Sequence, residues 1–181
     1  MSARRASPQT DDYRGAQVTL PSDTEILIVR DFAAPREVVF EAWTKPEHVA
    51  QWWDPSREGL ASCDIDFRPN GAFRFVPRGP KPPFSGTYRD IVPPERLVFS
   101  TVVAPSGAES IATLLFEERD GHTTLRLTIA CASKTDRDGL LEMRVAAGTA
   151  HTLENLNEYA GRLAGRTRQS PDRQPKTSEA S

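Results

Sequence analysis

The sequence predicts a single α+β domain in which one long C-terminal helix covers a curved antiparallel sheet. The chain begins its ordered part with a β-branched apolar run at residues 24–32, which helical periodicity follows. From residue 61 the period becomes strand-like, with turn signals every eight to twelve residues, and residues 139–165 return to a helical period. With 181 residues the chain suits one compact domain better than two. This order of elements is typical of an α+β layout.

The first elements are a buried strand and two short helices. Residues 24–32, TEILIVRDF, are rich in the branched side chains that favour strands. A helix is expected to begin near Pro35, since proline is favoured in a first helical turn. A second short helix should end at Asp54, because Pro55 disfavours helical backbone in the residue before it.

Six further strands are expected after the helix pair, which makes seven in total. The alternation in ASCDIDF (61–67) places Cys63, Ile65 and Phe67 on one face, and Asn70-Gly71 suits the turn that follows. The other five runs show similar patterning and are bounded by glycine, proline or aspartate. They lie at residues 72–76, 84–92, 97–103, 110–118 and 123–131.

The last helix carries an apolar stripe whose middle is small. The stripe contains large side chains toward both ends but Gly148 and Thr152 between them, with Thr149 beside these two. Small residues there either leave room for a cavity or let the helix approach the sheet closely, and the sequence does not separate the two. The predicted stripe consists of Leu141, Val145, Gly148, Thr152, Leu156, Tyr159 and Leu163.

Both ends of the chain are polar, so residues 1–21 and 165–181 are expected to be disordered tails around a domain at 22–164. The formal charge is −2, which argues against nucleic acid as a partner. No apolar stretch approaches the length of a membrane span, so we expect no membrane insertion and a cytoplasmic chain. The two cysteines and three histidines lack ligand spacing, and we expect no disulfide, metal or cofactor.

All three tryptophans lie within AWTKPEHVAQWWDP, at positions 43, 52 and 53. Helical geometry points Trp52 and Trp53 into the same interior. Burial of one indole ring contributes on the order of 5 kcal/mol as an upper bound, which alone explains a role as core anchors. The alternative is that at least one ring lines a pocket between the sheet and the last helix, where apolar walls with a few hydroxyls are typical of a small-molecule site.

Three charged residues of one strand alternate onto the same face, and two arginines on neighbouring strands are candidate companions. A solvated outer network is one interpretation, and an inward carboxylate-guanidinium group that orients a polar ligand is the other. The residues are Asp64, Asp66, Arg68, Arg74 and Arg126.

Four segments resemble a known family in order and spacing: REVVFEAWTKPEHVAQWWDP, DIDFRPNGAFRF, FSGTYRDIVPPERLVFS and GTAHTLENLNEY. They are similar to the START-like helix-grip superfamily (SRPBCC), in the branch of bacterial proteins similar to the C-terminal domain of the activator of the heat-shock-protein-ninety ATPase. The resemblance implies a seven-stranded antiparallel sheet wrapped around the C-terminal helix, with a cavity between them. A tryptophan often follows the glycine of the last helix in this branch, and here that position is Thr149, which implies a wider or more polar wall.

The function expected from these observations is the binding of a small hydrophobic or aromatic molecule in that cavity, by a monomer or homodimer. The resemblance keeps two alternatives open, a polyketide-cyclase-like enzyme that acts in the same cavity and a co-chaperone-like ATPase activator. The expected ligand-binding residues are Trp43, Trp52, Trp53, Phe73, Phe75, Tyr88, Val145, Gly148, Thr149 and Thr152.

Overall fold

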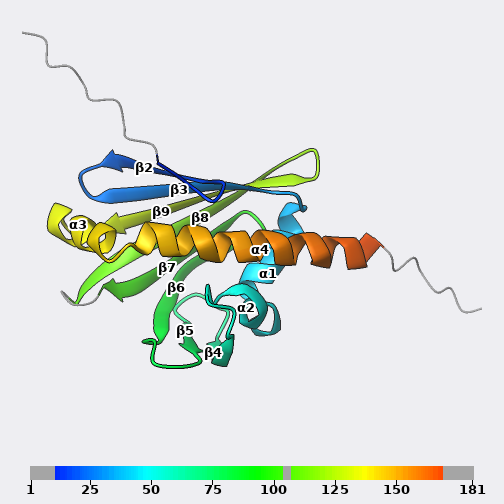
Figure 1. Cartoon of the computed structure of the whole chain (residues 1–181), viewed down its shortest axis with the longest axis horizontal. Helices are drawn as coiled ribbons and strands as arrows, with labels where there is room; N and C mark the ends of the chain where they lie inside the picture. Colours follow the sequence, from blue (N-terminus) through cyan, green and yellow to red (C-terminus); the bar gives the residue numbers. More distant parts are fainter. Residues whose placement is uncertain (1–10, 104–106, 169–181) are drawn as a thin grey trace, which may run out of the picture.

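The protein is a curved antiparallel sheet with a long helix packed across it, as expected (Figure 1). The structure, a computed structural model, describes residues 11–103 and 107–168. The strands are β1 (Asp11–Tyr13), β2 (Ala16–Ser22), β3 (Glu25–Phe32), β4 (Leu60–Ile65), β5 (Ala72–Pro77), β6 (Phe84–Val92), β7 (Arg96–Val103), β8 (Ala108–Arg119) and β9 (His122–Cys131). The helices are α1 (Arg36–Thr44), α2 (Pro46–Trp52), α3 (Lys134–Glu142) and α4 (Val145–Arg168).

The sheet order is β1-β2-β3-β9-β8-β7-β6-β5-β4, and each neighbouring pair is antiparallel. The strand expected at 24–32 is β3, and the six expected after the helix pair are β4 to β9. β3 pairs with β9, so the first and the last of the seven expected strands are neighbours within the sheet. The short helices α1 and α2 lie beside the middle of α4 (Figure 1).

The sheet has nine strands rather than seven, because part of the expected N-terminal tail is ordered. Residues 11–21 form β1 and nearly all of β2, and β2 extends the sheet by pairing with β3. Ala16 and Val18 of β2 are buried, which gives this hairpin an apolar face despite its polar composition. Residues 1–10 of the expected tail lie outside the described residues.

The expected single C-terminal helix is two helices. α3 is capped by the Ser133 hydroxyl, which accepts a hydrogen bond from the backbone N–H of Asp136 at 3.1 Å. Arg144 has a φ of 57°, which is left-handed backbone that a continuous helix does not contain, so α4 starts afresh at Val145. α4 runs to Arg168, beyond the boundary expected at 164, and residues 169–181 lie outside the described part of the chain.

The face of α4 that packs on the sheet is rotated from the predicted stripe. Leu156 belongs to both, but Gly148 is exposed, and Val145 and Thr152 are only partly buried. Small alanines dominate the buried line and let the helix lie close to β3. That line contains Ala146, Ala150, Leu153, Leu156, Ala160 and Ala164.

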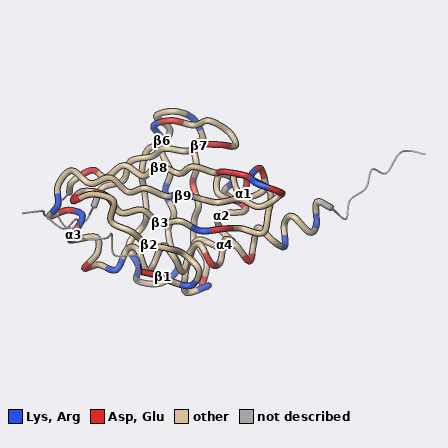
Figure 2. The backbone as a smooth tube through the Cα atoms, turned by 90° about the horizontal axis from the view of Figure 1, so that it is seen from above, with Lys and Arg blue, Asp and Glu red and all other residues tan. Residues whose placement is uncertain are grey.

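Most of the charged set is solvated, and only Arg126 of its members is partly buried. Asp64, Asp66 and Arg74 are exposed, and Asp64 lies opposite Arg74 in the pairing of β4 with β5. Asp66 forms an ion pair with Arg68 at 2.9 Å. Figure 2 shows Lys and Arg interspersed with Asp and Glu around the molecule. Among the described residues, no helix is long and apolar enough to cross a membrane.

Candidate functional site

A cavity of about 420 Å³ lies between the first half of α4 and the inner face of the sheet. Its walls come from α1, from the segments that follow α2 and β5, from β6 to β9, and from α3 and α4 with the residue between them. Most of these walls are hydrocarbon or aromatic. The lining residues are Trp43, Trp53, Pro55, Pro82, Pro83, Phe84, Phe99, Thr101, Val102, Ser110, Ala112, Leu127, Ile129, Leu140, Met143, Val145, Gly148, Thr149, Thr152 and Leu153.

Apart from the indole N–H groups of Trp43 and Trp53, the polar side-chain groups of the described cavity lining are four hydroxyls. Thr101 on β7 and Ser110 on β8 are hydrogen-bonded to each other with their oxygens 3.1 Å apart. On α4, the Thr152 hydroxyl donates to the carbonyl oxygen of Gly148 at 3.0 Å, and Thr149 lies beside them. Among the described residues, no acidic, basic, histidine, cysteine or tyrosine side chain lines this space. The walls therefore offer hydrogen bonds without charge.

The mouth of the cavity is apolar and open to solvent. Val102 is 69% exposed and Met143 is 54% exposed, although both side chains line the cavity. Pro82 and Pro83, on the loop between β5 and β6, are exposed wall residues as well. Large exposed apolar side chains around an opening are typical of a binding surface rather than of a sealed core.

The three tryptophans divide between core and cavity. Trp52 is 2% exposed, and its Nε1–H donates to the carbonyl oxygen of Ala42 at 2.9 Å, so it is a core anchor. Trp43 and Trp53 line the cavity with ring centroids 6.3 Å apart and planes at 87°. Trp53 also stacks on Phe84, a second wall residue, at 4.9 Å and 31°. Trp52 is thus a core residue, whereas Trp43 and Trp53 line the cavity.

The structure brings most of the expected ligand-binding residues to one cavity. Six of them line it: Trp43, Trp53, Val145, Gly148, Thr149 and Thr152. The other four, Trp52, Phe73, Phe75 and Tyr88, are buried and do not line it. They form a layer of rings behind the wall, in which Phe75 contacts Trp53 at 4.8 Å and Phe73 contacts Phe99 at 5.2 Å. Burial raises the pKa of Tyr88, which keeps this phenol neutral.

The strand side of the cavity was missed by the sequence reasoning. Phe99, Ala112, Leu127 and Ile129 are wall residues from β7, β8 and β9. They alternate with outward residues, and this alternation shows that they face inward. It does not show which inward residues the helix leaves uncovered, because that depends on where α4 crosses the sheet.

Gly148 faces open space rather than the strands. A Cβ atom placed on Gly148 would meet no other heavy atom within 4 Å. Close approach of helix and sheet therefore does not explain the glycine. Of the two interpretations of the small residues in α4, the room for a cavity is the one that the geometry supports.

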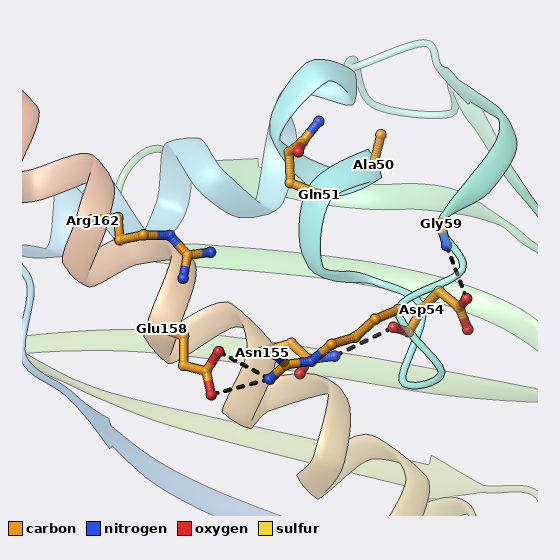
Figure 3. A pocket seen from close by; sticks show the side chains of 8 residues that line it. Ala50, Gln51, Asp54, Gly59, Asn155, Glu158 and Arg162 are labelled. Carbon is orange, nitrogen blue, oxygen red and sulfur yellow. Dashed lines mark hydrogen bonds and ion pairs between the residues drawn. The ribbon is translucent and has the colours of Figure 1, made fainter.

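A second, polar cleft of about 250 Å³ lies between α2 and α4, with Asp54 at one end (Figure 3). Only 2% of the Asp54 side chain is exposed. Its carboxylate accepts hydrogen bonds from the Lys81 ammonium at 2.9 Å, the Ser56 hydroxyl at 2.7 Å and the backbone N–H groups of Glu58 and Gly59 at 3.0 and 3.1 Å. Burial alone would raise the pKa of Asp54, but the hydrogen bonds from Lys81 and Ser56 outweigh it and lower the pKa to about 2.

Asn155 of α4 connects this cleft to the cavity wall. Its Nδ2 donates to the carbonyl oxygens of Trp52 and Asp54 at 3.4 and 3.3 Å, on either side of Trp53. Figure 3 shows Asn155 beside Asp54. Asn155 is buried, and its Oδ1 has no hydrogen-bond partner in the described structure. The amide thus fixes the backbone that carries Trp53, a cavity wall residue.

The described residues contain no group of three or more His, Cys, Asp or Glu side chains that could hold a metal ion. Cys63 and Cys131 are free. Burial, with a smaller effect from Asp64, raises the pKa of the Cys63 thiol to about 11, so it is protonated and a weak nucleophile at neutral pH.

Three solved structures are similar to this fold. A protein from Rhodobacter sphaeroides has a TM-score of 0.74 and 23% identity, with 81% of this chain and 99% of that chain covered. A protein from Nitrosomonas europaea has a TM-score of 0.70 and 21% identity over 81% of this chain and 99% of that one. A protein from Mycobacterium smegmatis has a TM-score of 0.69 and 20% identity over 86% of this chain and 99% of that one. No curated protein matches the chain.

Residues 33–161 match the family described as Activator of Hsp90 ATPase homolog 1-like protein. The matched region runs from just before α1 to the last third of α4, and so contains both short helices, β4 to β9 and all the lining residues of the cavity. β1, β2 and β3 lie before it. The chain belongs to the Activator of Hsp90 ATPase homolog 1-like family and has its START-like helix-grip fold.

Proposed function

We propose that this protein binds a small, uncharged, largely apolar molecule that contains an aromatic ring, in the cavity between α4 and the sheet. The observation that carries the proposal is the cavity of about 420 Å³, which has two indole walls, an apolar mouth and, among the described residues, no ionisable lining side chain. Pockets of this size with mostly apolar walls and a few polar groups are typical small-molecule sites.

The walls favour an aromatic ligand. Trp43 and Trp53 present two ring surfaces nearly at right angles, so a flat ligand stacks on one and meets the edge of the other. The layer of rings behind Trp53, which includes Phe75, holds this indole in place. The site is therefore largely formed before the ligand arrives, which reduces the ordering cost of binding.

The hydroxyls favour a ligand with one or two neutral polar atoms. Thr101 and Ser110 lie on the strand side, and Thr149 and Thr152 lie on the helix side. A charged ligand would lose its hydration without gaining an ionic partner, because the described lining carries no charge. A carbonyl, ether or hydroxyl group loses much less.

The same chemistry favours binding over the cyclase-like alternative. General acid-base catalysis needs a titratable group within hydrogen-bond reach of the reacting atom. The described lining supplies only neutral hydroxyls for this purpose.

We also propose that the protein is a cytoplasmic monomer or homodimer, as the sequence predicts. Fractionation of cells would test the location, and light scattering of the purified chain would test the oligomeric state.

The test uses two probes that differ by one anionic group. N-phenyl-1-naphthylamine is neutral, and 1-anilinonaphthalene-8-sulfonate has the same rings with an added sulfonate. We expect saturable binding of the neutral probe with one site per chain and at least about tenfold weaker binding of the sulfonate, since burial of an unpaired charge is costly. Titration by fluorescence and native mass spectrometry measures both. Equal affinities, or no binding of the neutral probe, would contradict the proposal.

A further inference from the structure

The loop that joins β5 and β6, residues 78–83, forms one side of the cavity mouth. We refer to this loop as the strap. Pro82 and Pro83 at its end line the cavity, while Trp53 and Pro55 line it from the segment that follows α2. Proline rings fix the backbone φ, so the end of the strap is stiff and moves as a unit.

One side chain ties the middle of the strap to the segment after α2. Lys81 directly precedes the two prolines, and its ammonium donates to the carboxylate of Asp54 at 2.9 Å and also to the Ser56 hydroxyl. At the start of the strap, the backbone N–H of Arg78 donates to the carbonyl oxygen of Gly59 at 3.1 Å. In the described structure, the hydrogen bonds between residues 79–83 and the segment after α2 all come from Lys81.

Asp54 is held independently of Lys81. Its carboxylate also accepts the N–H groups of Ser56, Glu58 and Gly59 and the Ser56 hydroxyl, so the turn at 54–59 keeps its own hydrogen bonds when the lysine is absent. Asn155 fixes the carbonyl of Asp54 from α4. The aspartate is therefore a rigid anchor, and the strap is the part that is free to move.

We propose that Asp54 and Lys81 are positioning residues that hold the strap against the Trp53 side of the mouth and thereby set how fast ligand enters and leaves. This inference rests on the proposed ligand-binding function of the cavity. Loss of the ion pair displaces Pro82 and Pro83 at the mouth but leaves the indole and hydroxyl walls in place. The association and dissociation rates should therefore rise together, with little change in Kd.

The experiment compares Lys81→Met with wild type in two assays. Lys81→Arg is the conservative control, and Lys134→Met is a matched control because Lys134 also pairs with an aspartate, Asp138, but on α3. Limited trypsin digestion measures opening of the strap through cleavage after Arg78, a site that all variants retain. Stopped-flow fluorescence with N-phenyl-1-naphthylamine measures the exchange rates.

We expect cleavage after Arg78 and both probe rates to rise about tenfold in Lys81→Met, because a hydrogen bond to a buried charge typically contributes this much to an equilibrium. Both controls should behave as wild type. Unchanged cleavage in Lys81→Met would overturn the inference, whatever the probe does. Faster cleavage with unchanged probe rates would also overturn it, since the strap would then not control entry. Faster cleavage with no probe binding even in wild type would support the tether and refute the proposed function instead.

Discussion

Replacement of Gly148 by leucine should stabilise the protein while it blocks the cavity. Gly148 is an exposed residue within α4, and a Cβ there meets no heavy atom within 4 Å, so the Cβ of the leucine fits without a shift of the backbone. Glycine is about 0.8–1 kcal/mol less favourable than alanine inside a helix, and leucine is close to alanine. For a chain of 181 residues this gain corresponds to a rise in Tm of about 2–4 °C.

The effect on binding should have the opposite sign. Gly148 lines the cavity, so the new side chain occupies part of the space that we propose for the ligand. Overpacking of a formed site costs about 1–3 kcal/mol, which weakens the affinity for N-phenyl-1-naphthylamine by about fivefold to 150-fold. Differential scanning calorimetry measures the first effect, and fluorescence titration measures the second.

Gly161 provides a matched control on the same helix. It is also exposed, and a Cβ atom at this position would likewise meet no heavy atom within 4 Å, but Gly161 does not line the cavity. Gly161→Leu should therefore raise Tm by a similar amount without a change in affinity. A fall in Tm for Gly148→Leu, together with normal behaviour of Gly161→Leu, would show that the space beside Gly148 is filled and would refute the reasoning.

Three further variants test the supports of the site. Asp54→Asn should lower the free energy of unfolding at pH 7 by about 2 kcal/mol, because folding lowers the pKa of Asp54 from 3.8 to about 2. This contribution to stability is present above pH 3.8 and disappears as the pH falls toward 2. Urea titrations measure it, and an equal loss of stability at pH 7 and pH 2 would contradict the prediction. Gly86→Ala should cost about 1–3 kcal/mol in denaturant melts, since its Cβ would lie 2.2 Å from the carbonyl oxygen of Ser100, and unchanged stability would be inconsistent with that contact. Trp52→Ala should cost about 3–5 kcal/mol by the same measurement, because the ring is buried and donates to Ala42, and a loss below about 1 kcal/mol would disprove its role as a core anchor.

The sequence predicted the arrangement of strands and helices between residues 24 and 163 because each element has a clear period. The prediction was wrong at β1 and β2, because the composition of this hairpin is polar and only Ala16 and Val18 of it are buried. These residues form strands because β2 pairs with β3, and no local sequence pattern predicts that pairing. The break at Arg144 was missed for a similar reason, since an arginine in left-handed backbone gives no sequence signal.

The cavity was predicted from the helix side and missed from the sheet side. Gly148, Thr149 and Thr152 were recognised because small residues interrupt a stripe of large ones. Phe73 and Tyr88 were expected at the wall because they are aromatic and face inward. The rings there are packed in more than one layer, and these two buried side chains lie behind the layer that lines the cavity. Which ring reaches the open space depends on the crossing of α4 over the sheet, and that crossing is fixed by the buried alanines of the helix.

The hydroxyl pair of Thr101 and Ser110 allows the cavity wall to act as either a hydrogen-bond donor or an acceptor. Either oxygen of the pair can donate to the other, so the remaining hydrogen is free to turn toward the interior or away from it. The same two residues can then hydrogen-bond to a ligand that carries an acceptor or to one that carries a donor, without any rearrangement of the backbone. A cavity with this lining would select ligands by the shape and size of the carbon skeleton more strictly than by the identity of a polar atom.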